Sequence, residues 1–315
     1  FSSLDFWYIF FVDTKLSKHE IYDDLFPNRK DGINAWISIM RGCDKFCTFC
    51  IVPFTRGRER SRSISSVIKE AKNILKSGYQ EITLLGQNVN SYKTSEGDFP
   101  ILLDRLGKIK AIKRIRYISP HPRDIDEDLL KVMVKYDNIC NQIHLPLQAG
   151  SSRILKRMNR TYTKEEFLNL VDMIRKYIPD CGLTTDIIVG FPGETEEEFQ
   201  ETLEVLSKVK FDTAFMFKYS ERPGTKASHY TDHIAEKIKQ SRLQTLIEFQ
   251  QNISLTNNRK RIGLNFENSF PAFSESTFSG FSPERPAKMF IRFFASGLFS
   301  NPFNSLGRGS ESVFA

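Results

Sequence analysis

Short β-prone segments alternate with amphipathic helical segments from about residue 30 to residue 258. The predicted strands are residues 35–40, 81–85, 114–118, 142–145, 184–189 and 213–217. Six β-then-α units require parallel strands joined by right-handed crossovers, so the sequence predicts an α/β protein, either an open doubly wound sheet or a barrel. In both architectures the functional side chains gather at the carboxyl ends of the strands.

Local signals mark where several of the predicted helices begin. Thr163 and Glu166 have the spacing of a capping box, in which each side chain bonds to the backbone of the other residue. Thr195 and Glu198 repeat this pattern ahead of another apolar stripe. A long helical pattern from about residue 234 to residue 257 closes the series.

Three of the five cysteines follow the first predicted strand with the spacing Cys43-x3-Cys47-x2-Cys50. A structural zinc site needs four ligands, and no further Cys or His has finger spacing. A redox pair at Cys47 and Cys50 would leave Cys43 unused. An iron–sulfur cluster held by only three thiolates leaves one iron open for another ligand, and we favour this alternative.

The cysteine count, the apolar segments and the net charge limit the expected cellular location and binding partners. An odd cysteine count with three packed together does not fit a secreted disulfide framework, and it predicts a reducing, cytoplasmic location. Cys140 and Cys181 stand alone and are expected to be small buried hydrophobes. The apolar run 6–12 is too short to cross a bilayer, so no membrane association is expected. A net charge of +7 suits a polyanionic partner, although many ordinary proteins share it.

The cysteine motif also carries a family resemblance. Phe49 precedes its last cysteine, giving the form C-x3-C-x-aromatic-C, and on this motif the chain resembles the radical S-adenosylmethionine (radical SAM) superfamily. Within it, five segments resemble the methylthiotransferase family: RGCDKFCTFCIVPFTRGRERSR (41–62), LLGQNVNSY (84–92), HLPLQAGS (144–151), MNRTYT (158–163) and DIIVGFPGET (186–195). The similarity covers about residues 13–265.

The resemblance implies a partial (β/α)6 barrel of the TIM-like, radical SAM type. It implies that Cys43, Cys47 and Cys50 bind a 4Fe-4S cluster, and that S-adenosyl-L-methionine binds the open iron through its amino and carboxylate groups. The implied reaction is methylthiolation of carbon 2 of N6-(dimethylallyl)adenosine at position 37 of tRNA, and GQNVNSY favours this branch. A reductase such as flavodoxin or ferredoxin and a monomeric state are also expected.

Other activities stay open beside this one. Within the enzyme class, the alternatives are methylthiolation of N6-threonylcarbamoyladenosine in tRNA or of an aspartate in a ribosomal protein. Outside it, the alternative is a non-catalytic iron–sulfur module that binds RNA.

The candidate cofactor-binding residues follow the predicted strands and are Gln87, Asn88, His144, Gln148, Arg157, Asp186, Gly190 and Glu194. The amides suit an adenine edge or a carboxylate, and Asp186 suits ribose hydroxyls. Arg157, one turn after Arg153, suits a carboxylate or a phosphate. A polar turn or a solvated helix face would explain several of these residues equally well. His121, Tyr219 and Arg222 are further loop candidates.

Four arginines directly follow the cysteine motif, namely Arg56, Arg58, Arg60 and Arg62. Such a run is usually a solvated face. Here it borders the predicted reactive centre, so we expect it to track the phosphates of a tRNA anticodon arm.

Both ends of the chain differ from the middle. Residues 1–29 are interpreted as a linker from a missing N-terminal methylthiotransferase domain, which would carry the second 4Fe-4S cluster, and residues 1–12 as aberrant. Residues 30–257 form the predicted barrel. Residues 258–315 are interpreted as a truncated or frame-shifted, disordered start of a TRAM domain, because residues 266–315 hold 11 of the 27 Phe. The radical-generating core is therefore not expected to complete methylthiolation alone.

Overall fold

The computed structural model of the protein describes residues 32–263. Its strands are β1 (Asn34–Ser38), β2 (Met40–Arg41), β3 (Arg60–Ser61), β4 (Glu81–Leu85), β5 (Lys93–Thr94), β6 (Gly97–Asp98), β7 (Arg114–Tyr117), β8 (Gln142–His144), β9 (Gly182–Val189) and β10 (Thr213–Lys218). Its α-helices are α1 (Val52–Arg56), α2 (Ile64–Lys76), α3 (Phe99–Gly107), α4 (Glu127–Lys135), α5 (Ser152–Arg157), α6 (Lys164–Tyr177), α7 (Glu196–Val209) and α8 (Glu236–Arg261). Short 3-10 helices occupy Val89–Ser91, Pro122–Asp124 and Lys226–His229.

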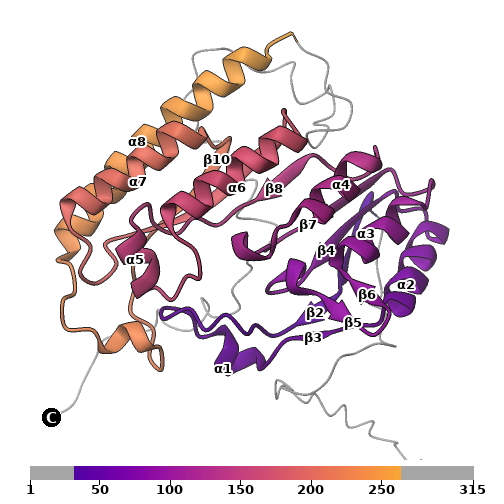
Figure 1. The fold of residues 1–315 in the computed structure, drawn as a ribbon, viewed down its shortest axis with the longest axis horizontal. Helices are drawn as coiled ribbons and strands as arrows, with labels where there is room; N and C mark the ends of the chain where they lie inside the picture. The colour runs from indigo at the N-terminus through magenta and orange to yellow at the C-terminus, as the bar shows by residue number, and fades with distance from the viewer. Residues whose placement is uncertain (1–31, 264–315) are drawn as a thin grey trace, which may run out of the picture. The chain divides into compact units, whose positions relative to one another are not determined.

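Two parallel three-stranded sheets, ordered β1-β4-β7 and β10-β9-β8, form the centre of the fold (Figure 1). The backbone of Ile115 in β7 joins them, because it pairs with Asn138 and Cys140 just before β8, at 2.7 and 3.0 Å. The strands therefore follow one another in chain order around a partial barrel. The predicted partial, TIM-like barrel of parallel strands is confirmed.

Helices cover the outer face of the strands. In β9 the buried residues alternate, and Leu183, Ile187 and Val189 belong to the main hydrophobic core. Residues of the other parity, such as Asp186, face the inside of the barrel and are partly exposed. Helices α7 and α8 lie side by side, and α8 packs against β9 and β10 (Figure 1). The barrel interior holds polar side chains such as Asp186 together with aromatic ones such as Phe215, whose ring centroid lies 6.0 Å from that of His144.

The helix signals in the sequence are confirmed. Thr163 with Glu166 and Thr195 with Glu198 form complete capping boxes at the starts of α6 and α7. The predicted long helix is α8, which continues to Arg261 and so passes the expected domain boundary at residue 258.

The first predicted strand, 35–40, differs in the structure. Strand β1 ends at Ser38, and Met40–Arg41 instead pairs antiparallel with Arg60–Ser61 as β2 and β3. The segment between these two short strands holds the cysteines, so the pairing closes the cysteine segment into a loop.

Several domain predictions concern residues that the structure does not describe. The interpretations of residues 1–29 and of residues 264–315 lie outside the described part of the chain. Among residues 32–263, no helix is both long and apolar enough to cross a membrane.

Candidate active site

The cysteine loop begins at a position that only glycine can occupy. Gly42 has a φ of +82°, and a Cβ atom there would lie 1.9 Å from the carbonyl oxygen of Arg58. Its N–H donates to Oε1 of Gln87, which follows β4, at 2.7 Å. The next amide, of Cys43, donates to the carbonyl of Gly57 at 3.2 Å. The start of the loop is therefore fixed from two sides.

The segment after α5 holds the other end of the loop. Nδ2 of Asn159 donates to the carbonyls of Lys45 and Phe46, at 3.1 and 2.9 Å. The amide of Thr48 donates to the carbonyl of Met158 at 3.0 Å. The sequence segment 158–163, which carried part of the resemblance, thus supports the cysteine loop.

All three cysteines of the loop are free thiols and are partly exposed. Burial raises the pKa of Cys43 to about 11, and burial also raises the pKa of Cys50. Among the described residues, no three His, Cys, Asp or Glu side chains surround a single metal ion. Each thiolate of a 4Fe-4S cluster binds a different iron, so the ligands need not converge on one point. Three free thiols on one short, braced loop fit such a cluster.

Arg160, which no sequence pattern marks as a site residue, points its guanidinium at this loop. Nη1 of Arg160 lies 3.4 Å from Sγ of Cys47. Nε donates to the hydroxyl of Tyr162 at 3.0 Å, and Nη2 donates to the carbonyl of Pro146 at 3.3 Å. The cation is therefore fixed beside the Cys47 thiol. The quoted segment MNRTYT contains Arg160, but nothing local indicated that its partner lies 113 residues earlier.

Two amide side chains after β4, predicted to bind the cofactor, instead form hydrogen bonds within the protein around the cysteine loop. Gln87 is exposed and accepts from Gly42, as described above. Asn88 is buried, and its Nδ2 donates to Glu59 at 3.2 Å and to Asp124 at 3.0 Å. Oδ1 of Asn88 is buried without a hydrogen-bond partner among residues 32–263. The Asn88 amide nitrogen is committed to protein carboxylates, so only its Oδ1 is left for the predicted cofactor contact, which stays a prediction.

His144 and Asp186 meet inside the barrel, on the adjacent strands β8 and β9. Nε2 of His144 lies 3.2 Å from Oδ2 of Asp186, and Nδ1 lies 3.0 Å from Oγ1 of Thr184. The Asp186 side chain remains about one third exposed, with 31% of its surface accessible. This carboxylate can accept hydrogen bonds from hydroxyl groups of a ligand while His144 holds it in place.

Gln148 shapes the edge of this site through its backbone. It is buried with a φ of +71°, an uncommon conformation for a residue with a side chain. Its amide donates to the carbonyl of Asp186 at 2.8 Å, and its carbonyl accepts from Ile188 at 2.9 Å. The loop after β8 is thereby attached to β9 beside Asp186.

A buried carboxylate holds the loop after β9 in place, and this loop does not present that carboxylate to a ligand. Glu194 accepts from the amide of Gly190 at 2.7 Å and from Nη1 of Arg242 in α8 at 2.9 Å. Burial raises the pKa of the Glu194 carboxyl to about 7. Glu194 departs from the predicted cofactor contact because it is 3% exposed and its Oε2 already accepts hydrogen bonds from Gly190 and Arg242. Gly190 has a φ of +69°, which allows the turn that places its amide.

The two arginines of α5 are paired within the protein. Arg157 forms an ion pair with Asp232, and its Nε donates to the carbonyl of Pro192 at 3.0 Å. Arg153 pairs with Glu198 at 2.6 Å. Both bind the loop after β9 to α5. Their geometry favours the structural role over contact with a cofactor carboxylate.

The four arginines after the cysteine motif differ in how far their side chains are exposed to solvent. Arg56 and Arg58 are exposed. Arg60 is partly buried and donates to the carbonyl of Arg58 at 2.9 Å. Arg62 is 4% exposed and forms an ion pair with Glu70 at 2.7 Å. Arg62 therefore departs from the predicted phosphate contact, since its guanidinium does not face solvent.

The region that holds this site matches a known family. Residues 37–206, more than half of the chain, match the family model described as the Radical SAM superfamily. The chain belongs to the radical SAM superfamily. The radical SAM methyltransferase TsrM from Kitasatospora setae, solved with tryptophan and an S-adenosylmethionine analogue, has a similar fold. Its TM-score is 0.53 at 19% identity, over 69% of this chain and 42% of that chain.

Curated relatives are much closer in sequence. The tRNA-2-methylthio-N(6)-dimethylallyladenosine synthase of Parabacteroides distasonis is 50% identical over 271 residues, covering 84% of this chain and 59% of the relative. The protein with that name from Acetivibrio thermocellus is 51% identical over 238 residues, covering 75% of this chain and 50% of the relative. The radical SAM chain thus spans between half and three fifths of these relatives' length.

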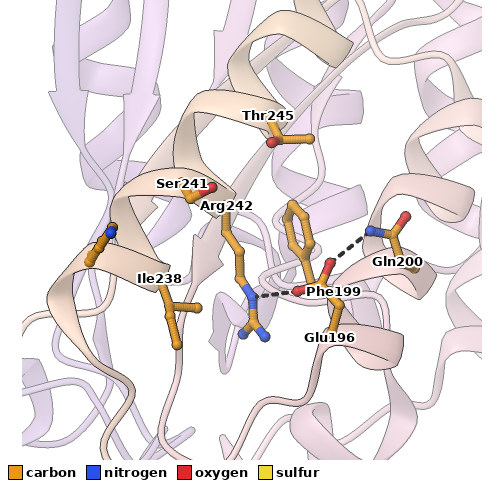
Figure 2. A pocket seen from close by; sticks show the side chains of 8 residues that line it. Glu196, Phe199, Gln200, Ile238, Ser241, Arg242 and Thr245 are labelled. Carbon is orange, nitrogen blue, oxygen red and sulfur yellow. Dashed lines mark hydrogen bonds and ion pairs between the residues drawn. The ribbon is translucent and has the colours of Figure 1, made fainter.

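A hollow of about 330 Å³ lies between α7 and α8, away from the cysteine loop of this radical SAM chain (Figure 2). It is lined by Glu196, Phe199, Gln200, Lys237, Ile238, Ser241, Arg242 and Thr245. Glu196 is held there by Nε of Arg242 at 3.2 Å and by Nε2 of Gln200 at 2.9 Å, so its carboxylate is already paired with protein groups.

Proposed function

We propose that the chain is part of a tRNA methylthiotransferase that modifies carbon 2 of N6-(dimethylallyl)adenosine at position 37. The observation that carries this proposal is a braced loop with three free cysteines in a radical SAM chain about 50% identical to synthases of that name. The loop lies after the first strand of a parallel barrel, where ligand sites of such folds form.

The cysteines are proposed to hold a 4Fe-4S cluster, with S-adenosylmethionine as the further ligand. When both are bound, they supply a 5′-deoxyadenosyl radical by reductive cleavage of the sulfonium. Cys43, Cys47 and Cys50 would each bind one iron. Arg160 would hold a positive charge beside the Cys47 thiolate at 3.4 Å. The chain's own contribution is to bind, orient and shield these groups.

The interior carboxylate is proposed to bind the cofactor's ribose. Asp186 retains accessible surface, and His144 orients it from the neighbouring strand. Gln87, which orients the cysteine loop, and Gln148, which attaches the next loop beside Asp186, would position these groups from either side. Asp186→Asn should weaken S-adenosylmethionine binding, whereas Asp180→Asn, on a solvent-exposed turn, should not.

The expected partners follow from the same proposal. The exposed Arg56 and Arg58 would meet tRNA phosphates next to the cluster loop. A flavodoxin- or ferredoxin-like reductase would supply the electron, and a second 4Fe-4S cluster would supply the sulfur. We further propose that the enzyme is a cytoplasmic monomer.

Nucleoside mass spectrometry of tRNA tests the proposed function. Deleting the gene for this chain should remove the 2-methylthio form of dimethylallyladenosine and leave dimethylallyladenosine unmodified at carbon 2. Loss of the methylthio form of threonylcarbamoyladenosine instead would assign the chain to the alternative tRNA substrate. Unchanged nucleosides would refute both assignments.

A further inference from the structure

Two phenylalanine rings lie exposed beside the cysteine loop. Phe46, within the loop, is 39% exposed, and Phe54, in α1, is 52% exposed. Their ring centroids are 6.0 Å apart in an edge-to-face arrangement, with an interplanar angle of 81°. The two rings form one apolar surface of fixed geometry. Large apolar side chains grouped on a surface often mark an interaction site.

The backbone presents Phe46 in a conformation that is unfavourable for this residue. Its φ is +49°, in the left-handed region, where a bulky side chain is uncommon. The hydrogen bonds from Asn159 to the carbonyls of Lys45 and Phe46 hold it there. Burial of the ring does not compensate this conformation, because the ring stays partly in solvent. Strain of this kind tends to occur at functional sites.

Positive charge adjoins the rings. The guanidinium carbon of Arg58 lies 5.2 Å from the centroid of the Phe46 ring, and the Arg58 side chain is 72% exposed. Arg58 pairs with Asp44 at 3.3 Å, which leaves most of its five N–H donors facing solvent. Arg56 is also exposed at the end of α1. Aromatic rings interleaved with arginines match single-stranded nucleic acid, whose bases stack and whose phosphates carry negative charge.

We propose that the Phe46–Phe54 surface stacks an unpaired nucleobase of an RNA, while Arg58 and Arg56 contact the neighbouring phosphates. This inference rests on the proposed function in one respect, because it takes the substrate to be an RNA loop. It adds the residues that grip the RNA outside the reacting adenosine. A protein partner would meet the same rings through apolar packing, and the experiment below separates the two.

Binding of an anticodon stem-loop RNA to the reconstituted full chain tests the proposal by fluorescence anisotropy. Phe46→Leu and Phe54→Leu should each weaken binding roughly tenfold, because a stacked base is lost while apolar volume remains. Phe46→Tyr should bind as the unsubstituted chain does, because its ring still stacks. Val134→Leu, at an exposed position on α4 with 53% accessible surface, is the matched control and should bind normally.

The salt dependence separates stacking from charge. Arg58→Gln should reduce the slope of log affinity against log salt by about one, whereas Phe46→Leu should leave that slope unchanged. Iron content and circular dichroism establish that each variant is folded and loaded. Normal RNA affinity of both leucine variants, or no RNA binding by the unsubstituted chain, would overturn the proposal. Neither result depends on the nucleoside analysis of tRNA, which tests the proposed function by itself. Failure of the stacking proposal and failure of the proposed function can therefore be distinguished.

Discussion

Replacing Glu70 with glutamine is expected to destabilise the fold strongly, although Glu70 is far from any reacting atom. Arg62 and Glu70 are almost completely buried, with side chains 5% and 2% exposed, and Nη1 of Arg62 lies 2.7 Å from Oε2 of Glu70. Arg62 also donates to the carbonyl of Ser38, at 2.8 Å, at the end of β1. The pair therefore connects α2, β1 and the strand that closes the cysteine loop.

The expected magnitude follows from burial. Removing one partner of a buried ion pair leaves an uncompensated charge and costs about 3–5 kcal/mol. Glutamine keeps one acceptor for Arg62, so the lower end, about 3 kcal/mol, applies to Glu70→Gln. With a urea slope of about 3 kcal/mol per molar, the unfolding midpoint should fall by roughly 1 M.

Urea unfolding of the full chain, followed by circular dichroism, measures this change. Glu248→Gln on the exposed face of α8 is the matched control, and it should change the free energy of unfolding by less than about 0.5 kcal/mol. A midpoint for Glu70→Gln within error of this control would refute the structural role of Arg62.

Three further predictions concern the site and its support. Arg160→Gln removes a cation 3.4 Å from Cys47 and should lower the reduction potential of the bound cluster by about 60 mV, because a charged hydrogen bond contributes about 1.5 kcal/mol. A redox titration followed by electron paramagnetic resonance measures this potential. A potential equal to that of the exposed control Arg105→Gln would contradict the prediction. Gly42→Ala places a Cβ atom 1.9 Å from a carbonyl oxygen and should sharply reduce the iron bound after reconstitution. Gly78→Ala is the control, because Gly78 has a similar φ of +88° but no described atom within 4 Å of the added Cβ, and it should retain iron. Equal iron contents of the two variants would argue against the clash. The pKa of Glu194 is raised to about 7 in the folded state, so protonation of Glu194 stabilises the fold, and this stabilisation should disappear as pH rises from about 4.5 through 7. Across that range the urea unfolding midpoint should fall more steeply for the unsubstituted chain than for Glu194→Gln. Parallel pH profiles of the two midpoints would disprove the raised pKa.

Features set by neighbouring residues could be predicted from the sequence. The capping boxes at Thr163 and Thr195 depend on a partner three residues away, and both are present. The strands and their parallel order follow from apolar periodicity and from the right-handedness of β-α-β connections. The cysteine spacing fixed the candidate cluster because all three ligands lie on one loop.

Features set by distant partners could not be predicted. Arg62 belongs to the same run as Arg56, and only the packing of α2 against β1 buries it. Glu194 has the composition of a ligand-binding loop, but Arg242, 48 residues later, captures its carboxylate. Arg160 reaches Cys47 across 113 residues. In each case the partner depends on how two barrel units pack together, which periodicity does not determine.

Formation of 5′-deoxyadenosine tests the central claim most directly. The chain is reconstituted anaerobically with iron and sulfide, then given dithionite and S-adenosylmethionine, and the products are separated by chromatography. We predict 5′-deoxyadenosine from the unsubstituted chain and from Cys140→Ala, whose cysteine is buried away from the loop, and none from Cys50→Ala. A chain that binds a full complement of iron and sulfide yet yields no 5′-deoxyadenosine would contradict the claim that Cys43, Cys47 and Cys50 hold a radical-generating cluster.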